Sequence, residues 1–99
     1  MLGIIKTIEN GKALFALAGR LDTTTAPELE QELKASLDSV GELTLDMKEL
    51  DYISSAGLRV LLSAQKTMNS RGSMTVRNAN ETVKEIFEVT GFSDILTIE

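Results

Sequence analysis

The stretch DMKELDYISSAGLRVLL, residues 46–62, decides how this chain is organised. It begins inside an alternating segment, Leu43–Met47, in which apolar residues recur at every second position and predict a β-strand. A short polar connection with acids at Glu49 and Asp51 follows. The apolar pattern of a helix then begins at Ser54 and Ser55, so the two serines lie where a connection becomes a helix.

The serine pair has two interpretations that the residues alone leave open. The first amides of a helix lack intrahelical partners, and a serine side chain can accept a hydrogen bond from them as an N-cap. The same amides, together with the helix dipole, favour an anion such as a phosphate group. Gly57 also has two interpretations that the sequence does not decide between. Its lack of a side chain allows close packing on a strand, or lets a partner backbone approach Ser55.

Upstream, the sequence predicts a β-hairpin followed by a helix. The isoleucine-rich segment Ile4–Glu9 and the apolar segment Lys12–Ala18 are strands, and Asn10-Gly11 between them is a strong two-residue turn signal. Thr25 and Glu28 have the spacing of a capping box, which predicts that a helix begins there and runs toward Gly41.

Downstream, the pattern predicts a helix from about Ser55 to Arg71 that Gly72 ends, a strand over Ser73–Arg77, a helix that Asn78 caps and Gly91 ends, and a short strand-like tail over Ile95–Ile98. The element order is β-β-α-β-α-β-α-β. Strands that alternate with helices after a first hairpin predict a single α/β domain over residues 1–99, with a mixed, mostly parallel sheet of four to five strands and three helices.

Composition excludes several classes of function. The 99 residues contain neither cysteine nor histidine, which removes zinc–thiolate sites, cysteine nucleophiles and the commonest general base. A net charge of −5 argues against nucleic acid or an anionic membrane as a partner. The longest apolar run, Ala13–Ala18, is too short to span a bilayer. We therefore expect a soluble cytoplasmic protein without a cofactor or a bound metal.

Polar residues follow three of the predicted strands, in the segments Asp22–Thr25, Asp46–Ser55 and Asn78–Asn80. Loops at the carboxyl ends of strands gather the function in open sheets of this kind. Asp22, Asp46 and Asp51 are conceivable as a magnesium pocket of a receiver-like domain, although solvated loops explain them better. Ser55 has no histidine partner and lies in no Gly-x-Ser-x-Gly elbow, so we expect no enzyme.

Two segments resemble the STAS domains, specifically the bacterial anti-sigma factor antagonists. The run YISSAGLRVLL, residues 52–62, resembles the family signature around a phosphorylated serine, with Ser55 at the phosphoacceptor and Gly57 at the glycine. Ser54 stands where many members carry Asp. The segment GRLD, residues 19–22, with the following Thr23–Pro27, resembles the family's Gly-x-Leu-Asp segment before a helix. The likeness covers essentially the whole chain.

This resemblance implies a regulator that works by partner switching. The unphosphorylated protein would bind a serine-kinase anti-sigma factor and so free a sigma factor. Phosphorylation of Ser55 by that kinase would end the complex, and a PP2C-type serine phosphatase would restore the hydroxyl. The free protein is expected to be a monomer. A STAS scaffold without a phosphorylation cycle is the alternative. The expected partner surface consists of Asp22, Thr23, Thr24, Ser54, Ser55, Ala56, Gly57 and Arg59.

Overall fold

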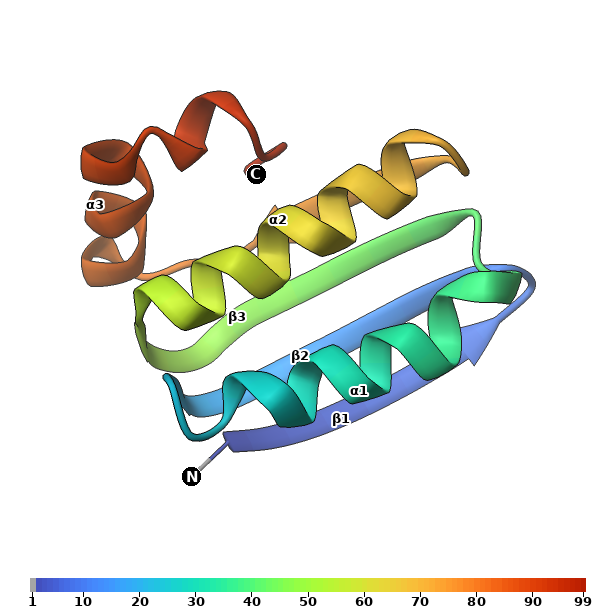
Figure 1. Ribbon diagram of the computed structural model, residues 1–99, viewed down its shortest axis with the longest axis horizontal. Helices are drawn as coiled ribbons and strands as arrows, with labels where there is room; N and C mark the ends of the chain where they lie inside the picture. Colours follow the sequence, from blue (N-terminus) through green and yellow to red (C-terminus); the bar gives the residue numbers. More distant parts are fainter. Residues whose placement is uncertain (1) are drawn as a thin grey trace.

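A computed structural model describes residues 2–99 and confirms the predicted α/β class, with one four-stranded mixed sheet and three helices (Figure 1). The strands lie in the order β1-β2-β3-β4. β1 is antiparallel to β2, and β2, β3 and β4 are parallel to one another. The elements are β1 (Leu2–Glu9), β2 (Lys12–Leu21), α1 (Ala26–Ser36), β3 (Glu42–Ile53), α2 (Ser55–Asn69), β4 (Ser73–Arg77) and α3 (Glu81–Thr90), with 3₁₀ turns at Leu37–Ser39 and Phe92–Asp94.

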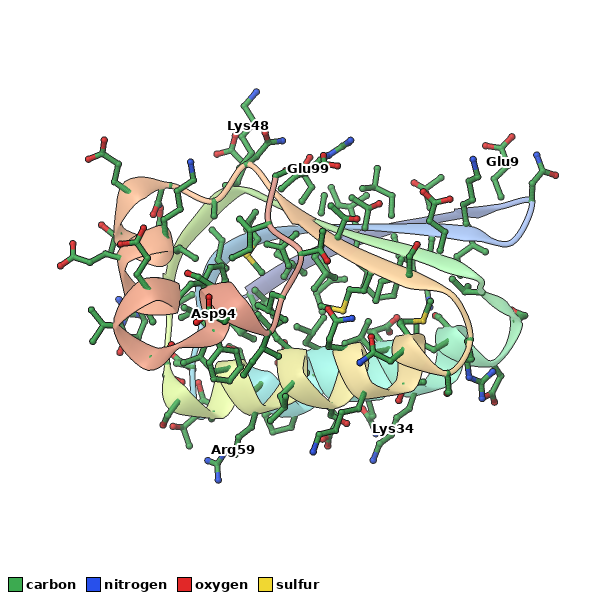
Figure 2. All side chains as sticks on the ribbon, turned by 90° about the horizontal axis from the view of Figure 1, so that it is seen from above. Glu9, Lys34, Lys48, Arg59, Asp94 and Glu99 are labelled. Atoms are coloured by element: carbon green, nitrogen blue, oxygen red, sulfur yellow. The ribbon has the colours of Figure 1, made fainter. Side chains whose placement is uncertain are left out.

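Helices α1 and α2 lie side by side on one face of the sheet, and α3 lies at one end of it (Figure 1). Seen from above, the helices lie below the sheet, and its other face is open over much of its area (Figure 2). Side chains alternate between the two faces of a strand. Accordingly Phe15 and Leu17 of β2 are buried on the helix-covered face. Ala16 and Ala18, which alternate with them and lie on the open face, are only half-buried.

The first hairpin turns at Asn10-Gly11, as predicted. Both residues have positive φ, 54° and 77°, which Asn and Gly tolerate better than other residues. The predicted last strand shrinks to an isolated parallel bridge between Val76 and Ile98. Within residues 2–99, no helix has both the length and the apolarity that crossing a membrane requires.

Strand β3 is much longer than the predicted Leu43–Met47. The prediction of a polar connection directly after Met47 is wrong, because those residues belong to the strand. The strand continues to Ile53 because β2 also continues to Leu21 and pairs with it. The register shifts twice, between Ala16 and Ala18 and between Gly19 and Arg20 of β2, which marks β-bulges. The bulges break the alternation of the sequence while still burying Leu50 and Ile53.

Two predicted capping residues have other roles. The Thr25 side chain makes no cap hydrogen bond to α1. Asn80, and not Asn78, caps α3 by accepting from the Val83 N–H at 2.8 Å. The predicted end of α3 at Gly91 is confirmed, because Gly91 has the left-handed φ of 83° that favours glycine there.

Gly72 does follow α2, but not as the left-handed glycine that was predicted. The helix ends at Asn69, and the Gly72 N–H donates to the Met68 carbonyl oxygen at 2.7 Å. A Cβ at Gly72 would overlap the carbonyl group of Gly41. The glycine is therefore required by a close approach of two backbone segments.

Candidate functional site

The two serines at the start of α2 are in different environments. Ser54 has an extended backbone, and its Oγ accepts from the Gly57 N–H at 3.5 Å, so Ser54 is the N-cap. Its side chain is half-buried. Ser55 is the first residue of the helix and is exposed, and no hydrogen bond of its hydroxyl is found within residues 2–99. The cap and a free hydroxyl therefore coexist on neighbouring residues.

Gly57 lies where the first turn of α2 meets the ends of two strands. A Cβ at this position would lie 2.7 Å from Leu21 Cγ and 2.8 Å from Ile53 Cγ1. Real Cβ atoms essentially never approach other atoms so closely, so the packing interpretation of Gly57 is confirmed. The close packing fixes the position of the helix start and therefore of Ser55.

The β2–α1 loop and the β3–α2 junction lie at the same edge of the sheet, as expected for parallel neighbours. Residues Arg20 and Leu21 at the end of β2 pair with Tyr52 and Ile53 at the end of β3. The Ser54 N–H donates to the Leu21 carbonyl oxygen at 2.8 Å, so one hydrogen bond joins the two segments directly.

Asp22 organises the β2–α1 loop from within. Its Oδ1 accepts from the Thr24 hydroxyl at 2.7 Å, the Thr24 N–H at 2.9 Å and the Thr25 N–H at 3.2 Å. The Thr24 hydroxyl and these amides hold the pKa of Asp22 below its ordinary value, because they stabilise the carboxylate. Buried Thr25 closes the loop from the other side, donating its hydroxyl to the Arg20 carbonyl oxygen and accepting from the Asp22 N–H, each at 2.8 Å.

Arg20 and Tyr52 were not among the predicted site residues, yet they connect the two segments. The guanidinium carbon of Arg20 lies 4.5 Å from the centroid of the Tyr52 ring, a cation–π contact. Arg20 Nε is also 3.8 Å from Asp22 Oδ2. The sequence signal was their position, since each is the last residue but one of a strand that leads into the site, but their pairing depends on the bulged register of β2 and β3.

A shallow groove of about 250 Å³ lies between the beginnings of α1 and α2. Arg59 lies one turn after Ser55 and lines this groove. Its side chain points away from the body of the molecule (Figure 2). The groove combines small and apolar side chains with the cation of Arg59 and the anion of Glu30. Its lining residues are Thr23, Ala26, Pro27, Glu30, Ala56, Arg59 and Val60.

The structure brings the eight predicted partner-surface residues together on these two segments. Four of them, Thr23, Thr24, Ser55 and Arg59, are exposed. Three others, Asp22, Ser54 and Ala56, are half-buried, and Gly57 is buried. Most of this set is therefore at least partly accessible from outside, whereas Gly57 fixes the position of the helix start.

Of the other predicted acids, Asp51 is exposed and lies two residues before the end of β3, whereas Asp46 lies further away. Asp46 is seven residues before the end of β3, about 20 Å along the strand from Ile53. Its Oδ1 accepts from the Asn78 side-chain amide at 3.1 Å and the Lys48 N–H at 3.0 Å, and these bonds, the first above all, lower its pKa. Within the described part of the chain, no three His, Cys, Asp or Glu side chains are grouped so that they could hold a metal ion.

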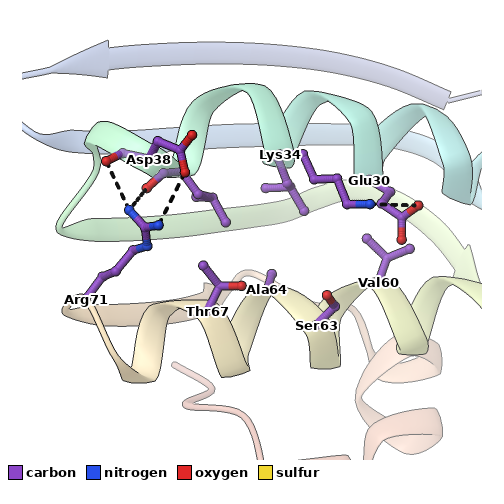
Figure 3. A pocket seen from close by; sticks show the side chains of 10 residues that line it. Glu30, Lys34, Asp38, Val60, Ser63, Ala64, Thr67 and Arg71 are labelled. Atoms are coloured by element: carbon purple, nitrogen blue, oxygen red, sulfur yellow. Dashed lines mark hydrogen bonds and ion pairs between the residues drawn. The ribbon is translucent and has the colours of Figure 1, made fainter.

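A second cavity, of about 230 Å³, lies between the middles of α1 and α2 (Figure 3). Leu33, Leu37 and Val60 give it an apolar lining. Ion pairs lie near its two ends, Glu30 with Lys34 at 3.9 Å and Asp38 with Arg71 at 3.3 Å. The Arg71 guanidinium also donates to the carbonyl oxygens of Leu37 and Asp38, so it ties α2 to the end of α1.

Comparison with known proteins gives a consistent result. The family model of the STAS domain matches residues 4–99. BtrV of Bordetella bronchiseptica, which carries the name of an anti-sigma factor antagonist, is 38% identical over 92 residues, covering 90% of this chain and 78% of BtrV. The anti-sigma-B factor antagonist of Bacillus subtilis is 30% identical over 83 residues, covering 83% of this chain and 76% of that protein.

Solved structures share the fold. An anti-sigma factor antagonist from Mycobacterium paratuberculosis superposes with a TM-score of 0.89 at 21% identity, covering 99% of this chain and 85% of that one. The antagonist SpoIIAA superposes with a TM-score of 0.78 in its unphosphorylated form, covering 98% of this chain and 87% of that one. The phosphorylated form of SpoIIAA superposes with a TM-score of 0.77, covering 98% of this chain and 91% of that one. The sequence identity to SpoIIAA is 14% for each of the two forms.

Proposed function

The chain belongs to the STAS domain family, and from this premise we propose that it is an anti-sigma factor antagonist switched by phosphorylation of Ser55. The observation that carries the proposal is that the two serines differ in role: one caps the helix and the other has an exposed hydroxyl. Ser54 caps α2, so the exposed Ser55 hydroxyl is not needed to complete the helix. A kinase can therefore modify Ser55 without removing a capping interaction.

In the proposed cycle, the unphosphorylated protein binds a serine-kinase anti-sigma factor and so releases a sigma factor. The contact surface is the exposed part of the two joined segments, from Asp22 to Thr24 and from Ser54 to Arg59. The groove between α1 and α2 at this edge accepts a small apolar element of the partner, and Arg59 and Glu30 at its rim set the charge that fits there.

The phosphoryl transfer itself uses the machinery of the kinase. Ser55 Oγ forms a bond to the γ-phosphorus of ATP, the bond from that phosphorus to the ADP oxygen breaks, and the hydroxyl proton passes to a base on the kinase. Phosphoserine adds about −1.5 to −2 charges at neutral pH. Such a charge in the middle of the contact surface weakens the complex, and a PP2C-type phosphatase reverses the change by hydrolysing the phosphoester.

The relatives support this proposal by their names, since both BtrV and the Bacillus subtilis protein are named as antagonists of anti-sigma factors. SpoIIAA, which shares the fold, has been solved in a phosphorylated and an unphosphorylated form. Its two forms superpose on this chain almost equally well, with TM-scores of 0.78 and 0.77. This agrees with a switch that keeps the fold.

The test is to incubate the protein with ATP and each anti-sigma kinase of the same genome, then measure its intact mass and map the phosphopeptide. We expect one phosphate, located on Ser55, and none on Ser55→Ala. A Ser54→Ala protein should still be modified. Binding of the kinase without any phosphate transfer would instead favour a scaffold, and phosphate on Ser54 would overturn the assignment of the acceptor.

Asp22→Ala, if folded, should bind the kinase more weakly than the parent.

A further inference from the structure

The outer strand β1 has an edge that no other strand covers within residues 2–99. It pairs only with β2, and its other side faces outward (Figure 1). Four large apolar side chains of the described chain are exposed, and β1 carries two of them, Ile5 at 73% and Ile8 at 45%. Unpaired strand edges with exposed apolar residues are templates for pairing with another strand.

The middle of β1 lacks the usual protections of an edge strand, and its exposed acidic residue, Glu9, is the last residue of the strand. All eight of its residues pair with β2 in a regular register, and none of them is proline. The one lysine, Lys6, would normally discourage pairing. Its ammonium group, however, lies 2.8 Å from Glu32 Oε2 and donates to Ser36 Oγ at 3.3 Å, so it is held against α1.

The two exposed isoleucines lie on opposite faces of the sheet. Ile5 is paired with Ala16 on the open face, and Ile8 is paired with buried Ala13 on the helix-covered face. An occupant of this edge must therefore offer an apolar side chain on each face at the matching spacing. The sequence of β1 itself has that arrangement.

We propose that two copies of this chain pair through β1, antiparallel and about a two-fold axis at Ile5, which joins the two sheets into one of eight strands. A two-fold interface uses the same surface on both copies. In this register Ile5 lies opposite Ile5 of the partner subunit on the open face. On the helix-covered face, Leu2 lies opposite Ile8 of the partner subunit, and the reverse pair repeats the contact.

Side-chain contacts, rather than charge alone, favour this register over its neighbours, because an axis at Ile4 would set Ile5 opposite Gly3. Side chains on one face must be paired with each other, so the two-fold axis can shift only in steps of one residue along the strand. An axis at Lys6 would bring two lysines directly opposite each other, which is unfavourable. An axis at Thr7 would set Glu9 opposite Ile5 and leave that isoleucine without an apolar contact.

The helix-covered face already has a place for the incoming side chain. A groove of about 370 Å³ lies between β1 and α1. It is lined by Leu2, Ile4, Lys6, Glu28, Gln31 and Glu32. In the proposed register, Ile8 of the partner subunit lies opposite Leu2 at this groove.

The inference departs from the monomer expected from the sequence, and it stands apart from the Ser55 cycle. β2 separates β1 from β3, the strand that leads to Ser55. Failure of the pairing would therefore leave the proposed switch untouched, and failure of the switch would leave the pairing untouched.

The first test is sedimentation velocity on the full chain from ~1 μM to ~1 mM, a range that covers weak association. We expect a monomer at the low end and a dimer at the high end. Ile5→Lys should stay monomeric throughout, because two lysines would then face each other. Val89→Lys is the matched control, since Val89 is equally exposed, at 80%, but lies on α3. It should dimerise like the parent.

The second test determines the register. An equimolar mixture of Ile5→Lys and Ile5→Glu should form a heterodimer, although neither variant associates alone, because the new charges would lie opposite each other. Amide signals of residues 2–9 should shift with concentration in the parent. A parent that is monomeric at ~1 mM, a dimer that Ile5→Lys leaves intact, or a mixture that stays monomeric would each overturn the proposal.

Discussion

The Ser54 N–H donates to the carbonyl oxygen of Leu21 at 2.8 Å. This bond joins the residue that caps α2 to the last residue of β2, directly before the loop that Asp22 organises. The candidate phosphoacceptor is therefore attached to a neighbouring loop through the backbone. Changes at the two serines, at Gly57 and at Asp22 should have separable effects, since each of these residues has a distinct contact.

Ser54→Ala should lower the free energy of unfolding by about 0.5–1 kcal/mol, the lower part of the range for a lost N-cap, because its bond to Gly57 is long at 3.5 Å. Ser55→Ala should change it by less than about 0.5 kcal/mol, as expected for an exposed side chain. Urea denaturation of both variants measures the difference. A larger loss for Ser55→Ala than for Ser54→Ala would show that the capping roles are reversed.

Gly57→Ala should destabilise the protein although it adds a better helix former. The new Cβ would lie 2.7 Å from Leu21 Cγ, and over-packing of this kind costs about 1–3 kcal/mol. Helix propensity returns at most ~1 kcal/mol. We expect a net loss of about 1–2 kcal/mol in urea denaturation, on the same principles. Gly41→Ala is the control, because a Cβ there meets open space. Equal stability of both variants would contradict the close packing.

Thr24→Val should raise the pKa of Asp22 toward its ordinary value, because the Thr24 hydroxyl is the largest cause of the lowered pKa. A carboxyl group with a lowered folded-state pKa adds stability above its unfolded pKa, and this stability is lost as pH falls through the folded pKa. The contribution of Asp22 to stability is therefore fully present at neutral pH, is lost below about pH 4, and is smaller in Thr24→Val. Carboxyl carbon NMR on parent and variant measures it. An unchanged Asp22 titration in Thr24→Val would show that the hydroxyl bond is unimportant.

Ser55→Ala should bind the cognate kinase about as well as the parent, whereas Ser55→Asp should bind at least tenfold more weakly, a difference of about 1.4 kcal/mol. The hydroxyl is a substrate that adds little affinity, and a negative charge is rejected. Ser63→Asp is the matched control, since it is the same change at an exposed serine further along α2. Calorimetry with the purified kinase measures all three. Equal affinities of Ser55→Ala and Ser55→Asp would exclude a switch based on charge.

Local patterns predicted the framework of this fold well. The Asn10-Gly11 turn was predictable because both residues adopt positive φ, and the parallel direction of β2, β3 and β4, though not their order, followed from the alternation of strands and helices. If β2 and β3 were neighbours, the parallel direction predicted that the Asp22 loop and the Ser55 junction would meet, and the structure shows that they are neighbours. The STAS resemblance, carried by Ser55 and Gly57, was confirmed by the family match.

Features that depend on pairing between distant segments were not predictable. The second half of β3 breaks the period of two because of its bulges, and only its partner β2 shows that the segment is a strand. Thr25 has the spacing of a capping residue, yet its hydroxyl finds the Arg20 carbonyl oxygen instead. Likewise the contact of Arg20 with Tyr52 joins two residues that are far apart in the sequence.

Phosphorylation of Ser55 should leave the fold unchanged. The phosphate would lie at the N-terminus of the 15-residue helix α2, where free amides and the dipole favour a negative charge by about 0.3–1 kcal/mol. Asp46 lies about 20 Å from Ile53 along β3, beyond the screening length at physiological salt, whereas exposed Asp51, two residues before Ile53, offsets part of this gain by repulsion. The Ser54 cap and the close packing at Gly57 remain in place.

We therefore expect the same far-UV spectrum, a melting temperature close to that of the parent, and amide shift changes confined to residues 52–60 and 20–26. NMR of the phosphorylated and free proteins measures this directly. Shifts that extend across residues 83–89 of α3, or a collapse of the melting temperature, would show that the phosphate acts by remodelling the domain.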